Sequence, residues 1–151
     1  PVSYICFRML RQNWQDKARF AALLKWMMGL MLVGALVAIL LLVWVGPWVV
    51  ELAYGKAYVT SAGLLFWLSL SLFFVMPNYI LTQAAIADNK GSSYAWITVV
   101  ASIGNVSMNL YLIPRYGAVG AAWATIASEA LMLGLLLVVF RKYLFTRSMP
   151  A

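Results

Sequence analysis

Charged residues are scarce in this chain. They make up 10% of its 151 residues, whereas hydrophobic residues make up 65%, and the mean hydropathy is +0.89. A soluble globular domain carries about 25% charged residues, so this composition excludes an ordinary soluble domain and indicates an integral membrane protein. In a bilayer, a chain of this length has room for four or five spanning helices of about 20 residues each.

Histidine is absent, and Cys6 is the only cysteine. The sequence therefore lacks the commonest general base and neutral metal ligand, and no disulfide can form within the chain. The acidic residues lie far apart and give neither a carboxylate pair nor metal-ligand spacing; they are Asp16, Glu51, Asp88 and Glu129. We therefore predict no catalytic residue, no metal site, no cofactor and no enzymatic activity.

Acidic residues are outnumbered by basic ones, and the net charge is +7. In a soluble protein such an excess points to nucleic acid. Here the basic residues cluster near the ends of the chain, where they orient a membrane protein against the anionic cytoplasmic leaflet. We expect membrane lipids as partners and no nucleic acid.

Four long runs lack charge almost entirely, and they define the expected fold. Each is long enough to cross a hydrocarbon layer of about 30 Å as a helix. The runs cover residues 26–50, 57–87, 91–114 and 116–140, the last interrupted only by Glu129. We predict an all-α, polytopic membrane protein with a four-helix transmembrane region over residues 21–147. Its helices are expected at about 23–46, 61–86, 93–113 and 117–140.

Glycine, proline and polar residues mark the ends of these helices. Gly46-Pro47 is expected to end the first helix, and residues 51–56 to form a hydrophilic turn. Residues 88–91 and 114–117 give two further tight turns. Such short connections make neighbouring helices antiparallel.

The distribution of lysine and arginine predicts the orientation. With a cytoplasmic N-terminus, nine basic residues face the cytoplasm and two, Lys56 and Arg115, face the other side. The positive-inside rule therefore places both ends of the chain in the cytoplasm.

The segment before the first helix is polar and basic, with aromatic residues interleaved. We expect residues 1–20 to form an amphipathic connector helix on the cytoplasmic surface, and residues 148–151 to form a tail. An alternative is a lipid headgroup site at the cytoplasmic rim of the helices. Its candidate contacts are Arg8, Arg11, Lys17, Arg19 and Lys90.

Polar side chains recur on one face of the second expected helix. Ser71, Asn78 and Thr82 are seven and four residues apart, and Pro77 precedes the asparagine. A proline inside a helix favours a kink. The kink is either a packing feature with satisfied side chains or a hinge that borders a cavity, as broken helices do in transporters.

A polar stripe runs along the third expected helix. Its members are three or four residues apart and so share one face: Tyr94, Thr98, Ser102, Asn105 and Asn109. Hydrocarbon cannot satisfy asparagine amides, so this face must contact other helices or water. The stripe is either interhelical glue or one wall of a hydrophilic cavity.

Glu129 lies near the middle of the fourth expected helix. A charge at the bilayer centre costs at least about 2.5 kcal/mol, so this side chain must face the bundle. Ala121, Thr125 and Glu129 continue one face. Glu129 is either a functional acid in a transport path or a neutral, hydrogen-bonded structural acid. The candidate cavity-lining residues are then Asn78, Thr98, Ser102, Asn105, Asn109, Thr125 and Glu129.

The segment from Asn109 to Gly117, with Gly120-Ala-Ala, Ala124-Thr125 and Ser128-Glu129, resembles the C-terminal region of bacterial polysaccharide-repeat (O-antigen type) flippases. Two weaker motifs agree, Tyr54-Gly55-x-x-Tyr58 and Pro1-Val-Ser3. These flippases belong to the multidrug/oligosaccharidyl-lipid/polysaccharide exporter superfamily. The resemblance covers nearly the whole chain.

The resemblance implies the C-terminal part of the second lobe of a 12–14 helix transporter in the bacterial inner membrane. Such proteins translocate undecaprenyl-pyrophosphate-linked oligosaccharides by alternating access, for surface polysaccharide biosynthesis. The implied partners are this lipid-linked oligosaccharide and the missing N-terminal helices. One departure matters: no lysine or arginine lies inside a membrane run, although a pyrophosphate requires cations.

Two other functions remain open. A multidrug exporter of the same superfamily would use a cavity acid such as Glu129 for a cationic drug. A non-transporting four-helix scaffold or subunit would form a complete bundle with no unsatisfied polar stripe.

Overall fold

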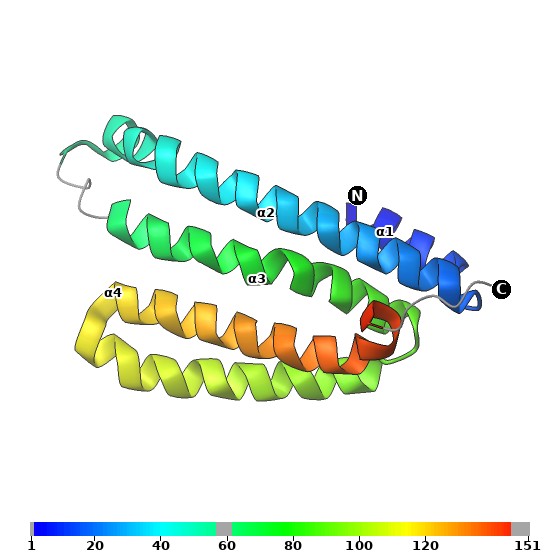
Figure 1. Ribbon diagram of the computed structural model, residues 1–151. Coiled ribbons are helices and arrows are strands. Elements are labelled where there is room, and N and C mark those ends of the chain that lie inside the picture. The colour runs from blue at the N-terminus through cyan, green and yellow to red at the C-terminus, as the bar shows by residue number, and fades with distance from the viewer. Residues whose placement is uncertain (1, 57–61, 146–151) are drawn as a thin grey trace.

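The computed structural model describes residues 2–56 and 62–145, and every regular element in that part of the chain is a helix. The elements are α1 (Val2–Gln12), α2 (Lys17–Tyr54), α3 (Ala62–Ala87) and α4 (Gly91–Phe145). The three long helices α2, α3 and α4 are each apolar enough to cross a membrane (Figure 1). The prediction of an all-α, polytopic membrane protein is confirmed.

Helix α4 contains two spans. At 1.5 Å per residue its 55 residues would reach about 80 Å, far more than the hydrocarbon core of about 30 Å. The chain turns back at Gly117, whose φ of 57° and ψ of −136° lie outside the helical region, and Figure 1 shows the two parts of α4 running side by side. We call residues 91–116 the first arm and residues 118–145 the second arm. The four predicted spans are thus α2, α3 and the two arms.

Gly46-Pro47 does not end a helix, contrary to the sequence prediction. Helix α2 continues through Pro47 and ends at Tyr54, where Gly55 has a φ of 86° and its N–H donates to Glu51 O at 2.8 Å. Residues 48–50 are apolar, and backbone groups in hydrocarbon must be satisfied within the helix. The one backbone hydrogen bond that Pro47 cannot donate therefore costs less than ending the helix inside the membrane.

The expected connector over residues 1–20 is also not one helix. Helix α1 ends at Gln12, and α2 starts at Lys17 after an N-cap by Asp16, whose carboxylate accepts from Arg19 N at 3.0 Å. An aspartate satisfies otherwise unpaired N–H groups at a helix start, which favours a new helix at this residue. The predicted tail, residues 148–151, lies outside the described residues, as do Pro1 and Tyr58 of the two weaker motifs.

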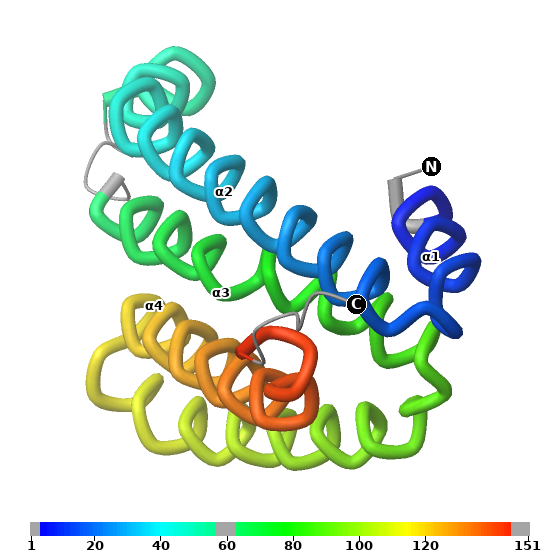
Figure 2. The backbone as a smooth tube through the Cα atoms, turned by 45° about the vertical axis from the view of Figure 1, so that its right-hand side comes forward, coloured from blue at the N-terminus to red at the C-terminus, as the bar shows by residue number. Residues whose placement is uncertain are grey.

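The helices pack most tightly at one end of the molecule. There α1, the start of α2, the last turns of α3 and the end of the second arm share a core. Its largest fully buried side chains include Leu10, Phe20, Leu24, Ile80 and Phe140. Figure 2 shows α1, the start of α2 and the end of the second arm near the C-terminal end of α3. In contrast, Trp44 and Trp48 of α2 are 81% and 80% exposed, which suits a lipid-facing surface.

Candidate functional site

A polar groove lies between α3 and the two arms of α4, and its volume is about 720 Å³. Helix α3 contributes Asn78, Tyr79 and Thr82 on successive turns. The second arm contributes Thr125 and Glu129, which are four residues apart and share a helical face. The groove therefore brings the polar faces of α3 and the second arm together.

The first arm forms the third wall of the groove. Tyr94, Thr98, Ser102 and Asn105 of the predicted stripe all line it. Asn109 does not: it borders a separate recess of about 280 Å³ beside Pro114. The structure thus gathers six of the seven candidate cavity residues around one groove. That a transported molecule passes this groove remains a prediction.

Glu129 is held by Asn78 at the centre of the groove. The Asn78 amide donates one bond to the Glu129 carboxylate at 2.7 Å and another to the Glu129 carbonyl at 2.9 Å. Asn78 is 3% exposed and follows Pro77, which is fully buried inside α3. Both amide hydrogens are used, whereas Asn78 Oδ1 is buried without a partner among the described residues. This contact joins α3 to α4 at the depth where hydrocarbon tolerates polar groups least.

A second polar contact joins the two arms of α4. Asn105 Nδ2 donates to Ser128 Oγ at 2.9 Å, and Ser128 Oγ donates to Thr125 O at 3.0 Å. Asn109 Nδ2 donates back to Asn105 Oδ1 at 2.9 Å. Asn105 therefore acts as interhelical glue, the other interpretation of the stripe, although it also borders the groove. The bonds of Asn109 stay within the first arm.

Four polar lining residues are not among the predicted candidates. Thr82 and Tyr94 belong to the predicted polar faces, whereas Tyr79 and Ser128 do not. Tyr79 follows Asn78 directly, and Ser128 precedes Glu129. Ser128 sits three residues after Thr125, a spacing that places both near one helix face. That spacing was a usable signal for Ser128, but nothing in the α3 pattern distinguished Tyr79 from a lipid-facing residue.

One acidic residue lines the groove. Glu129 is the only charged residue among the lining residues that the structure describes. Arg141 lies twelve residues after Glu129 on the second arm, or about 18 Å at 1.5 Å per residue. Lys90 lies in the turn between α3 and α4. Glu129 thus lines the groove, and the basic residues lie nearer the ends of the helices.

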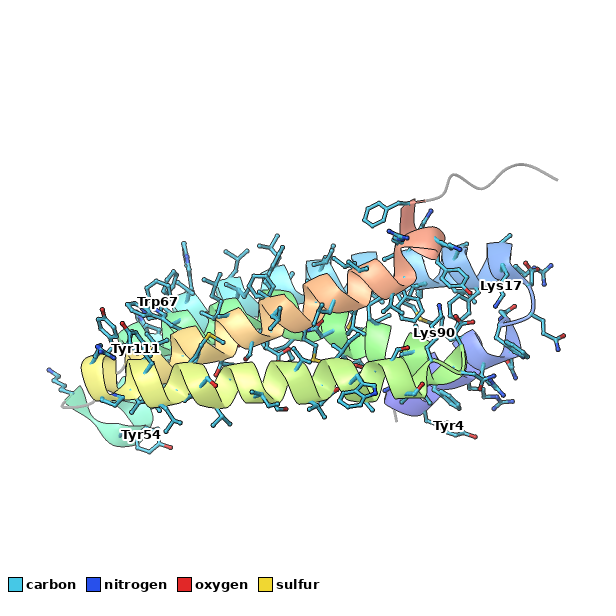
Figure 3. All side chains as sticks on the ribbon, turned by 90° about the horizontal axis from the view of Figure 1, so that it is seen from below. Tyr4, Lys17, Tyr54, Trp67, Lys90 and Tyr111 are labelled. Carbon is cyan, nitrogen blue, oxygen red and sulfur yellow. The ribbon has the colours of Figure 1, made fainter. Side chains whose placement is uncertain are left out.

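Three of the five candidate headgroup residues contact the turn between α3 and α4. Asp88, in the turn between α3 and α4, pairs with Lys17 Nζ at 3.1 Å and with Lys90 Nζ at 2.8 Å. Arg11 donates to Ala87 O at 2.8 Å and to Asn89 Oδ1 at 3.1 Å. Figure 3 shows Lys17 and Lys90 near the same end of the molecule. These contacts link α1, α2 and the α3–α4 turn.

Asp88 is the centre of this cluster, since its side chain is only 5% exposed. Burial by itself would raise the pKa of Asp88, but hydrogen bonds from Lys90 and Lys17 outweigh burial and hold the pKa below its usual value. Tyr143 on the second arm also donates to the carboxylate, at 3.1 Å. The cluster therefore fixes the end of α4 to the other helices.

The two remaining candidates differ. Arg19 pairs with Asp16 of the α2 cap at 3.3 Å. Arg8 is exposed and has no ion pair or side-chain hydrogen bond among the residues that the structure describes. Contact with lipid headgroups stays a prediction for all five, with Arg8 the most available.

Aromatic residues gather at the opposite end of the molecule. Trp123 packs against Trp67 and Tyr116 with ring centroids 5.6 Å and 5.1 Å apart, and Arg115 lies 3.7 Å from the Tyr111 ring centroid. Figure 3 shows Trp67 and Tyr111 at this end, away from Lys17 and Lys90. Aromatic residues are typical of membrane–water interfaces. The two ends therefore suit the two surfaces of a bilayer.

Comparison with known proteins gives one family. The family model described as "Lipid II flippase MurJ" matches residues 7–149. No curated protein and no solved structure matches the chain significantly.

Proposed function

Because the chain belongs to the MurJ family of lipid II flippases, we propose that it forms part of a bacterial inner-membrane transporter that moves a lipid-linked glycan precursor across the bilayer by alternating access. The family match over residues 7–149 carries this proposal. The chain is a multi-pass membrane protein of a flippase family. Membership in a family of transporters also confirms the prediction that the chain is not an enzyme.

The proposed substrate is lipid II, the lipid-linked precursor of peptidoglycan. The sequence resemblance was to polysaccharide-repeat flippases, and the family match supports it at the level of lipid flippases of that superfamily. The description of the matched family names lipid II rather than an undecaprenyl-pyrophosphate-linked repeat unit. Both substrates combine a long lipid with a hydrophilic glycan, so the same physical problem of crossing hydrocarbon applies to each.

In the proposed mechanism, the hydrophilic part of the substrate moves along a polar path while its lipid tail stays in the bilayer. The groove between α3 and α4 borders that path, together with helices that precede this chain. Its polar lining supports this placement, as do the exposed tryptophans of α2 on a lipid-facing surface. The Asn78–Glu129 contact beside the α3 proline would then yield when the lobes rock.

The groove also bears on the two alternatives. A complete four-helix scaffold would bury its polar stripe, whereas Ser102 is exposed in the groove. This favours a transporter whose polar face meets further helices or water. An exporter of cationic drugs would also suit Glu129, and it is distinguished from a lipid flippase by its substrate.

The test is transport by the full-length protein in liposomes. Lipid II carrying a nitrobenzoxadiazole fluorophore on its peptide is reconstituted, and dithionite, which does not cross the bilayer, reduces the outer-leaflet dye. With the protein present, we expect more than half of the dye to be reduced, because inner-leaflet lipid II reaches the outer leaflet. Protein-free liposomes are the control.

Three further outcomes distinguish the alternatives. If an undecaprenyl-pyrophosphate-linked oligosaccharide is moved and lipid II is not, the polysaccharide-repeat assignment holds. If the protein lowers the accumulation of a cationic dye and moves neither lipid, it is a drug exporter. No transport of any of these substrates would favour the scaffold.

A further inference from the structure

Four hydroxyl groups in the groove have no hydrogen-bond partner within the described residues. They belong to Tyr79 and Thr82 on α3 and to Tyr94 and Ser102 on the first arm. None of these hydroxyl oxygens is fully buried, because Asn78 Oδ1 and Trp123 Nε1 are the buried side-chain atoms without a partner in this part of the chain. The groove therefore presents donors and acceptors that are open to a ligand.

The charge of the groove limits what this ligand can be. No lysine or arginine is among the described lining residues, so the groove offers a phosphate no cation to bind, and Glu129 adds acceptor oxygens rather than donors. A pyrophosphate would instead bind where cations gather, as Arg-rich and Lys-rich sites do. A carboxylate, amides and free hydroxyls suit a neutral group that is rich in hydroxyls, because each hydroxyl both donates and accepts.

Size and shape agree with such a ligand. The volume of about 720 Å³ lies within the range of about 300–1,000 Å³ that is usual for small-molecule sites. Tyr79 is 37% exposed, so its ring offers an apolar surface with a polar tip beside the hydrogen-bonding groups. A sugar needs this combination, since its ring has apolar C–H faces and a polar edge.

We infer that the groove between α3 and α4 is a subsite for the neutral sugar of the lipid-linked substrate, and that the pyrophosphate binds outside it. This inference rests on the proposed function. The hydroxyls of Tyr79, Tyr94 and Ser102 hold the sugar, and Glu129 accepts from sugar hydroxyls. The groove then selects the glycan, and the carrier lipid is recognised elsewhere.

The experiment compares two lipids that differ only in the sugar. The full-length protein is titrated with undecaprenyl pyrophosphate and with the same lipid carrying a neutral N-acetylated disaccharide, and binding is measured by native mass spectrometry. The ratio of the two dissociation constants measures the contribution of the sugar. We expect the disaccharide lipid to bind at least ten-fold more tightly.

Two serines on the first arm give a matched pair of variants. Ser102 and Ser107 are both exposed, but only Ser102 lines the groove. We expect Ser102→Ala to lower the ratio by about five-fold, the effect of one lost hydrogen bond, and Ser107→Ala to leave it unchanged. Tyr94→Phe provides a second test of the same kind. Binding of the sugar-free lipid should be the same in all three variants.

The outcomes separate this inference from the proposed function. If both undecaprenyl lipids bind equally well and more tightly than phosphatidylglycerol, the sugar subsite is refuted while a lipid-carrier flippase stands. Equal losses in Ser102→Ala and Ser107→Ala would also refute the subsite. If neither undecaprenyl lipid binds better than phosphatidylglycerol, the proposed function itself fails.

Discussion

Gly120 lets the two arms of α4 approach more closely than any other residue would allow. A Cβ atom added at Gly120 would lie 2.5 Å from Leu112 O and 2.7 Å from Leu112 C. Real Cβ contacts stay beyond 3.0 Å, and the obstacle is backbone across the Gly117 turn, which cannot rotate away as a side chain does. Gly120→Ala must therefore push the arms apart by at least 0.5 Å at this point.

The expected cost follows from two opposing effects. Overpacking of this kind costs about 1–3 kcal/mol, and the upper part of that range applies because the contact is with backbone. Alanine recovers about 1 kcal/mol of helix propensity over glycine. We therefore expect a net loss of about 2 kcal/mol, which for a chain of this size corresponds to a fall in Tm of roughly 4–8 °C.

Gly134→Ala is the matched control, because it lies on the same arm and an added Cβ would meet nothing within 4 Å. It should raise Tm by a few degrees through helix propensity alone. Both variants are measured by tryptophan fluorescence during heating of the purified protein in detergent. If Gly120→Ala matches Gly134→Ala, the close approach of the arms at Leu112 is wrong.

Three further predictions use the same thermal assay. Asp88→Asn should lower stability at pH 7. Because the folded-state pKa of Asp88 is depressed, the stability that its carboxylate contributes is complete above pH 3.8, the ordinary pKa, and is lost as the pH falls below that value. The wild type should therefore lose its advantage over the variant in acid, and a pH-independent difference would contradict this. Asn78→Ala should lower the free energy of unfolding by about 1–2 kcal/mol because it removes two interhelical bonds to Glu129. Asn109→Ala should lower it less because the bonds of Asn109 stay within one arm. Equal losses in the two variants would contradict the Asn78–Glu129 contact. Arg11→Ala should destabilise the protein by about 1 kcal/mol because it removes the bonds to the α3–α4 turn. Arg8→Ala should change stability by less than about 0.5 kcal/mol. The reverse order would refute the contacts between α1 and the α3–α4 turn.

Much of the fold could be read from the sequence because hydrocarbon imposes strict rules. Backbone groups must be satisfied inside each span, so long uncharged runs are helices and the charges mark their ends. The same rule explains why the prediction for Pro47 was wrong: local proline chemistry favours a helix end there, but the surrounding apolar residues require the helix to continue. The break at residues 13–16 depended on a single capping aspartate, which the amphipathic pattern concealed.

The site was predictable only in part. Helical spacing put Thr98, Ser102 and Asn105 on one face, and that face lines the groove. Spacing does not say which helices face one another, so the partner of Glu129 could not be named from the sequence. The basic residues show the same limit: Arg11, Lys17 and Lys90 looked like free rim cations until the turn at Asp88 was seen to gather them.

The sequence by itself determined the class of molecule, the number of spans and which polar residues share a helix face, because these follow from transfer energies and periodicity along one chain. Only the tertiary structure decided which polar groups pair and which stay open. Asn78 and Glu129 are 51 residues apart, and their contact depends on how α3 crosses α4. That crossing is set by the packing of side chains from several helices, so it has no signature in any one of them.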